Sequence, residues 1–119
     1  MKFTDLVEIK KTLPFEYNGV QLHAKNVTMA EFDRLTERLK NSLNLEVIKD
    51  AEEKKRREEE VKETTLYVLR ELLLDKDGNP FDEFKEASWE DIQDTLPAAY
   101  FQGLLRAILE TLSGKSSGN

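Results

Sequence analysis

The feature that most constrains the fold is residues 66–112, where two apolar segments flank a sharp polar turn. In the first segment, leucines recur at helical spacing from Leu66 to Leu73. Residues 75–80 (DKDGNP) then end that helix, because glycine accepts a left-handed backbone and proline cannot continue a helix. The sequence therefore predicts two apolar helices that must cover each other or a partner.

The second apolar segment begins after Pro97, which suits the first turn of a helix because its missing N–H is not needed there. A short helix is expected just before it, with Ser88 and Asp91 at capping-box positions. The apolar stripe of the last helix is wide, and exposed stripes mark interfaces, so we expect partner binding and self-association through it. The candidate partner-binding residues are Tyr100, Phe101, Leu104, Leu105, Ile108, Leu109 and Leu112.

The N-terminal part predicts a β-hairpin. Asn18-Gly19 is typical of a type I′ turn, in which both central residues need positive φ. A two-residue loop pairs Tyr17 with Val20 and sends alternate side chains to opposite faces. The apolar face must pack on a helix, because an isolated hairpin is marginally stable. That face comprises Phe15, Tyr17, Val20 and Leu22, and the polar face comprises Glu16, Gln21 and His23.

A first long helix should begin at Thr28, with Glu31 at its capping-box position. We expect an α+β, mostly helical fold in a single domain over residues 1–112. The hairpin should pack on this first long helix. The two helices of residues 66–112 should then form an antiparallel pair joined through the short helix. Residues 113–119 (SGKSSGN) should form a disordered tail.

Residues 49–63 are almost purely charged, and the sequence leaves their structure open. Opposite charges four residues apart, such as Glu53 and Arg57, favour a solvated helix. A flexible linker is the alternative. A nucleic-acid patch at residues 54–57 (KKRR) is disfavoured, because the flanking glutamates neutralise it.

The net charge of −6 resides in residues 64–112, which carry four basic and ten acidic side chains. Such an excess opposes nucleic-acid binding and favours a basic or apolar protein partner. No apolar run approaches the roughly 18–20 residues of a membrane helix, and the N-terminus lacks the apolar core of a signal peptide. We therefore expect a cytoplasmic location, with no nucleic-acid or membrane partner.

Few residues of the chain are of the types that carry out catalysis. The chain has no cysteine and a single histidine, His23, so we expect no catalytic residues, no cofactor and no enzyme activity. Residues 75–86 place acidic side chains at the spacing of a calcium-binding loop. The sixth position of such a loop needs glycine for a sharp turn, and Pro80 stands there, so no metal site is predicted.

Residues 66–112 combine, in order, an apolar helix, the acidic turn DKDGNPF, an acidic short helix and an apolar helix opened by Leu96-Pro97. This order resembles the tail assembly chaperones of long-tailed, siphovirus-type phages. The resemblance implies a non-enzymatic chaperone that binds and solubilises the tape measure protein and helps to recruit tail tube subunits. It would act in the host cytoplasm and be absent from the mature virion.

Tail assembly chaperones are often made in two forms, the longer one through a programmed ribosomal frameshift, and the longer form engages the tail tube protein. A slippery run of G then A can encode Gly114-Lys115, in a tail that needs no fixed structure. The resemblance therefore implies a minor, frameshifted product. The alternative function is a small cytoplasmic helical adaptor or regulator that binds one defined protein.

Overall fold

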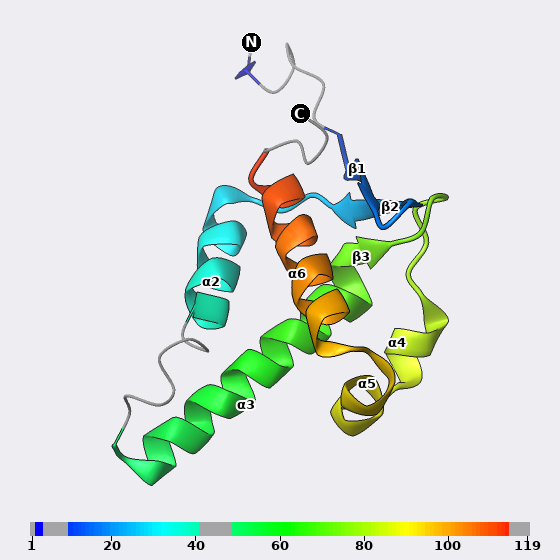
Figure 1. The fold of residues 1–119 in the computed structure, drawn as a ribbon. Coiled ribbons are helices and arrows are strands. Elements are labelled where there is room, and N and C mark those ends of the chain that lie inside the picture. Colours follow the sequence, from blue (N-terminus) through cyan, green and yellow to red (C-terminus); the bar gives the residue numbers. More distant parts are fainter. Residues whose placement is uncertain (1, 4–9, 41–48, 115–119) are drawn as a thin grey trace.

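The computed structural model describes residues 2–3, 10–40 and 49–114, and it has the predicted α+β, mostly helical fold (Figure 1). A small antiparallel sheet lies at one side of a group of helices. The elements follow in the order β1 (Thr12–Tyr17), β2 (Val20–Lys25), α2 (Met29–Lys40), α3 (Ala51–Tyr67), η2 (Val68–Leu72), β3 (Leu73–Leu74), α4 (Asp82–Glu86), α5 (Trp89–Thr95) and α6 (Ala98–Leu112).

Strands β1 and β2 form the predicted hairpin in the predicted register, with Phe15 opposite Leu22. Asn18 and Gly19 have φ values of 50° and 81°, so both central residues of the turn are left-handed, as a type I′ turn requires. Phe15 and Leu22 are buried on the inner face. Val20 belongs to the same face but is 50 % exposed, because it lies next to the turn.

A third strand, β3, differs from the sequence expectation, which places Leu73 and Leu74 in a helix. These leucines pair with β2 instead, with His23 opposite Leu74 and Ala24 opposite Leu73. Both leucines are buried, and consecutive buried side chains suit a strand that is covered on both faces. His23, which the sequence places on the polar face of the hairpin, is half-buried beside β3, and its Nδ1 lies 3.2 Å from the carbonyl oxygen of Asp75.

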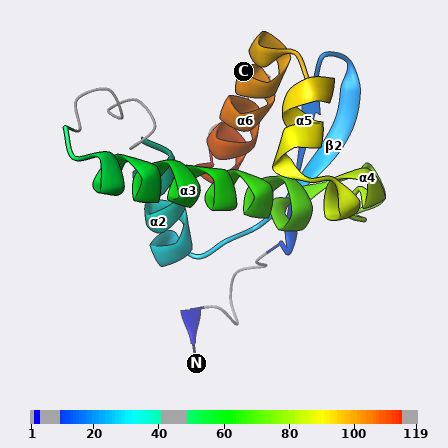
Figure 2. The ribbon, with the colours of Figure 1, turned by 90° about the horizontal axis from the view of Figure 1, so that it is seen from below.

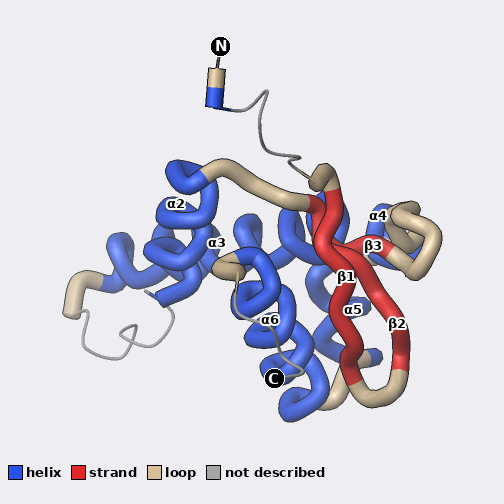
Figure 3. The backbone as a smooth tube through the Cα atoms, turned by 90° about the horizontal axis from the view of Figure 1, so that it is seen from above, coloured by secondary structure: helices blue, strands red, loops and turns tan. Residues whose placement is uncertain are grey.

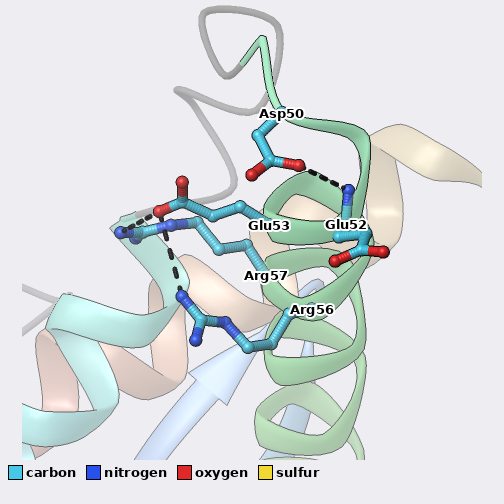
Figure 4. Close-up of polar contacts among 5 residues, drawn as sticks. All are labelled: Asp50, Glu52, Glu53, Arg56 and Arg57. Carbon is cyan, nitrogen blue, oxygen red and sulfur yellow. Dashed lines mark hydrogen bonds and ion pairs between the residues drawn. The ribbon is translucent and has the colours of Figure 1, made fainter.

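The charged segment is a helix and not a linker, since α3 runs unbroken from Ala51. Asp50 caps its first turn, and the Oδ1 atom of Asp50 accepts a hydrogen bond from the backbone N–H of Glu52 at 3.0 Å. Oε1 of Glu53 lies 3.4 Å from Nη2 of Arg57 and 3.9 Å from Nη2 of Arg56 (Figure 4). Because exposed pairs of this kind contribute only about 0.3–0.5 kcal/mol each, they support the helix without anchoring it.

Helix α3 is anchored by η2, the π-helical turn that continues it. The backbone N–H of Leu73 bonds to the carbonyl oxygen of Val68, which widens the last turn. Val68, Leu69 and Leu72 have no exposed surface. One helix therefore passes from a solvated charged half into the centre of the hydrophobic core, where it shares a cluster of buried residues with Ile108 of α6.

Helix α6 lies between α2 and the hairpin (Figures 1 and 3). The hairpin packs on a long helix, but this is α6 and not the expected α2: among the helices, α6 contacts β1 and β2 most extensively. Helix α2 packs on α3, where Nε of Arg38 lies 3.7 Å from Oε1 of Glu60. The expected antiparallel pair is also corrected: α6 crosses α3, and β3, α4 and α5 connect the two (Figures 1 and 2).

The hairpin meets α6 at Gly103. The hydroxyl of Tyr17 donates a hydrogen bond of 2.7 Å to the carbonyl oxygen of Tyr100, and the two rings pack edge to face with centroids 5.0 Å apart. A Cβ atom at position 103 would lie against this hydroxyl and 3.2 Å from Cζ of Tyr17. Glycine therefore lets the tyrosine ring approach the backbone of α6.

Two residues that the sequence assigns to the tail instead close the last helix. After Leu112, the backbone N–H of Gly114 donates a hydrogen bond of 3.1 Å to the carbonyl oxygen of Thr111. Gly114 has a φ of 87°, which glycine adopts without strain at a helix end. Ser113 and Gly114 thus belong to the end of α6, and the rest of the predicted tail lies outside the described residues.

Replacing Gly103 by alanine should lower the free energy of unfolding by about 1–3 kcal/mol, because the new methyl group would collide with Tyr17. In an unobstructed helix the same change stabilises by up to ~1 kcal/mol. Urea denaturation of G103A, alone and combined with Tyr17→Phe, tests the contact. Removal of the hydroxyl should recover part of the loss, and strictly additive effects would contradict the contact.

Candidate functional site

The stripe that the sequence predicts to bind a partner does not form one open face of α6. Leu104, Ile108 and Leu112 are 4 %, 0 % and 9 % exposed and belong to the core. As a correction to the sequence expectation, these three side chains are out of reach of any partner of the folded chain. Surface remains on the other four members of the stripe, which are half-buried or exposed: Tyr100, Phe101, Leu105 and Leu109.

Leu105 and Leu109 lie on one side of an open hollow between α2 and α6, which we call the α2–α6 groove. Its volume is about 580 Å³. Phe32 and Leu39 of α2 contribute further apolar surface, and both are half-buried. Phe32 and Leu105 also pack against the core, so the groove is continuous with the hydrophobic interior. Polar side chains complete its lining: Thr36, Lys40, Gln102, Arg106, Glu110 and Ser113.

Local sequence positions the α2 side of this groove. Oγ1 of Thr28 accepts a hydrogen bond of 3.2 Å from the backbone N–H of Glu31, so the helix begins where the sequence predicts. The apolar side chains of α2 then divide between two directions. Leu35 is 6 % exposed and enters the core, whereas Phe32 and Leu39 line the groove. Helix α2 thus attaches to the core and still presents apolar surface beside α6.

A second apolar hollow, the α5–α6 pocket, lies at the N-terminal end of α6. The ring of Trp89 packs edge to face on Phe101, with centroids 6.2 Å apart and planes 73° apart. The pocket has a volume of about 290 Å³, smaller than the α2–α6 groove. Its lining comprises Trp89, Ile92, Gln93, Leu96, Ala98 and Phe101.

Two polar arrangements hold α5 in place. The predicted capping box is present: Oγ of Ser88 accepts from the backbone N–H of Asp91, and Oδ2 of Asp91 accepts from the backbone N–H of Ser88, both at 3.2 Å. The guanidinium of Arg70 donates to the carbonyl oxygens of Phe84 and Ala87 at 2.9 Å and 2.7 Å. Because hydrogen bonds from charged donors are the stronger ones, Arg70 ties the α4–α5 connection to η2.

The acidic turn after β3 is held by the side chain of its first residue, Asp75. Oδ1 of Asp75 accepts hydrogen bonds from the backbone N–H groups of Asp77 and Asn79, at 2.8 Å and 3.0 Å. Gly78, and not Pro80, takes the left-handed conformation, with a φ of 84°. Within residues 2–3, 10–40 and 49–114, no three His, Cys, Asp or Glu side chains gather as metal ligands would. The Asp75 carboxylate therefore serves the turn.

Three residues of these hollows are not among those that the sequence predicts: Phe32, Leu39 and Trp89. The apolar spacing of α2 indicates that its side chains pack, but it does not say which of them face α6. The single tryptophan lies beside the predicted capping box, and only the crossing of α5 over the start of α6 brings it to Phe101. A search for apolar side chains left half-buried in the folded chain would have found all three.

Comparisons with known proteins give no relative. No protein-family model matches the chain, and neither a curated protein nor a solved structure matches it. Among the helices of the described residues, none has the length and apolar character to cross a membrane. We therefore infer the function from the order of the sequence elements and from the two apolar hollows of α6.

Adjacent substitutions on α6 should have opposite consequences for folding. Ile108→Asp buries a charge at a position with no exposed surface and should unfold the chain, since even truncation to alanine costs about 2–5 kcal/mol. Leu109→Asp lies at the groove and should leave helical content intact. Circular dichroism and thermal melting of both variants test this division, and similar melting temperatures would show that the assignment of the two faces is wrong.

Proposed function

We propose that this chain is a non-enzymatic tail assembly chaperone of a long-tailed phage, and that it binds the tape measure protein in the α2–α6 groove. Two observations support the proposal. The order of elements in residues 66–112 resembles that of tail assembly chaperones. The observation that carries it, however, is the groove itself, a hollow of about 580 Å³ with apolar side chains in its lining, which lies between two helices.

The groove suits an amphipathic helix, which binds by laying its apolar stripe into an apolar channel. Phe32, Leu105 and Leu109 would meet that stripe, and the surrounding polar side chains would face the polar flanks of the bound helix. Each bulky apolar side chain that is removed from water contributes about 1.5–3 kcal/mol before the cost of ordering the complex. A few such contacts give reversible binding, as a chaperone requires if it is to be displaced by tail tube subunits.

The end of α6 supports a role for a longer form. Ser113 and Gly114 close the helix and are exposed, so any extension would begin at the surface and away from the core. A frameshifted product could therefore carry a segment that recruits the tail tube protein without disturbing residues 1–112. We place both forms in the host cytoplasm during tail assembly and outside the mature virion.

The cognate tape measure protein should stay soluble when it is co-expressed with the native chain and should co-purify with it. Leu109→Asp should reduce the soluble yield, because it places a charge in the groove, and it should also reduce any self-association seen by gel filtration. Ala99→Asp is a matched control, since Ala99 is exposed on α6 and lines neither hollow.

Equal solubility of the tape measure protein with both variants would overturn the groove assignment. If the native chain fails to bind the tape measure protein and purifies with one unrelated cytoplasmic protein, the adaptor or regulator function would replace the chaperone.

The native gene, expressed with its natural downstream sequence, should yield a minor longer product that shares residues 1 to about 115 with the main one, since a frameshift at Gly114-Lys115 leaves the end of α6 intact. Mass spectrometry of intact proteins and of the tryptic peptides that follow Lys115 tests this. A single product ending at Asn119 would refute the two-form model while leaving the groove assignment unaffected.

A further inference from the structure

The net negative charge of the chain is concentrated in the segment that contributes α5 and the start of α6 to the α5–α6 pocket. Residues 75–101 carry eight acidic and two basic side chains, a net of −6, which equals the net charge of the whole protein. This segment contains α4 and α5 and the first turn of α6 (Figure 1). The rest of the chain is therefore neutral on balance, and the α5–α6 pocket is lined in part by α5, one of the helices that carry this charge.

The carboxylates of α4 and α5 are not used by the fold as ion-pair partners. Glu90 and Asp94 on α5 are exposed, as are Glu83 and Glu86 on α4. The ion pairs found among the described residues join α2 to α3 or lie within α3, and none of them involves α4 or α5. Arg70 of η2, whose guanidinium reaches the α4–α5 connection, donates to backbone carbonyl oxygens. These carboxylates therefore remain available to a cationic partner.

The pocket itself is apolar, with the Trp89 and Phe101 rings and the Leu96 side chain in its lining. Its volume of about 290 Å³ accommodates a bulky apolar side chain but not a helix. An apolar hollow within an acidic surface combines two requirements on a ligand. The ligand must carry positive charge, which the carboxylates attract, and it must present an apolar group, which the pocket removes from water.

We infer that the α5–α6 pocket binds a basic, amphipathic segment of a partner protein, with one bulky apolar side chain in the pocket and lysine or arginine side chains facing the carboxylates of α5. Nucleic acids and anionic membrane surfaces are repelled by the same charge. This site lies at the N-terminal end of α6, whereas the α2–α6 groove borders its C-terminal half. The inference therefore goes beyond the proposed function and does not depend on it.

The single tryptophan of the chain makes the site directly measurable, because Trp89 lines the pocket. The probe is a short amphipathic peptide of lysine and leucine with one phenylalanine and no tryptophan. Titration of the full chain with this peptide should give a saturable change in Trp89 emission as water leaves the ring. A peptide with the same leucines and with glutamate in place of lysine should give none.

A matched pair of variants tests whether the peptide binds at the α5–α6 pocket. Ala98 and Ala99 are neighbouring exposed residues in the first turn of α6, and only Ala98 lines the pocket. Ala98→Lys should weaken binding by about tenfold or more, because it puts bulk and like charge at the pocket. Ala99→Lys should have a small effect, because it adds the same charge outside the lining. Neutralising the pair Glu90→Gln and Asp94→Asn should weaken binding by about twofold to fivefold per carboxylate.

Leu109→Asp, which alters the α2–α6 groove, should leave the titration unchanged, so failure at one site is distinguishable from failure at the other. Three results would each overturn the inference: an emission spectrum that the basic peptide does not change, equal weakening by Ala98→Lys and Ala99→Lys, or equal binding of the acidic peptide.

Discussion

The burial of η2 is the constraint on which the rest of the structure depends. Val68, Leu69 and Leu72 are removed completely from water and are among the largest fully buried side chains of the described residues, where burial contributes about 25 cal/mol per Å². A helix as charged as α3 is only marginally stable alone in water. The burial of η2 at its C-terminal end supplies the stabilisation that its exposed ion pairs cannot. Because β3 follows η2 directly, the same burial places Leu73 beside β2, where it pairs as part of the third strand of the sheet.

Helix α6 is the second element of this arrangement, and its position explains why apolar surface remains. One side of α6 fills the core, and Tyr17 of the hairpin occupies a further part of its surface over Gly103. The neighbouring elements α2 and α5 cover only parts of what is left. Among residues 2–3, 10–40 and 49–114, the elements that surround α6 leave part of its apolar surface uncovered, and this surface lines the two hollows.

The two hollows differ in their surroundings, which suggests different ligands. The α2–α6 groove is the larger, and its lining mixes Lys40 and Arg106 with Glu110, so shape and apolar contact would dominate recognition there. The α5–α6 pocket is small, and its lining comes from the acidic segment of residues 75–101. Charge would therefore select the ligand, and the pocket would determine which apolar side chain of the ligand is buried.

The sequence by itself determined the features that depend on neighbours in the chain. Asn18-Gly19 fixed the hairpin turn and its register, Thr28 and Ser88 fixed helix starts, and the apolar spacing fixed the existence of α6. In each case the deciding forces act within a few residues, through positive φ, a capping oxygen or helical periodicity.

Only the tertiary structure decided which surfaces meet. Leu73 and Leu74 are compatible with either helix or strand, and pairing with β2 selected the strand. The seven apolar residues of α6 are alike in sequence, yet burial against η2 and the hairpin withdrew three of them from any partner. Phe32 and Trp89 joined the candidate surfaces because of how α2 and α5 cross α6. Packing between distant segments depends on the total apolar area that all elements can bury together, and no local pattern encodes that sum.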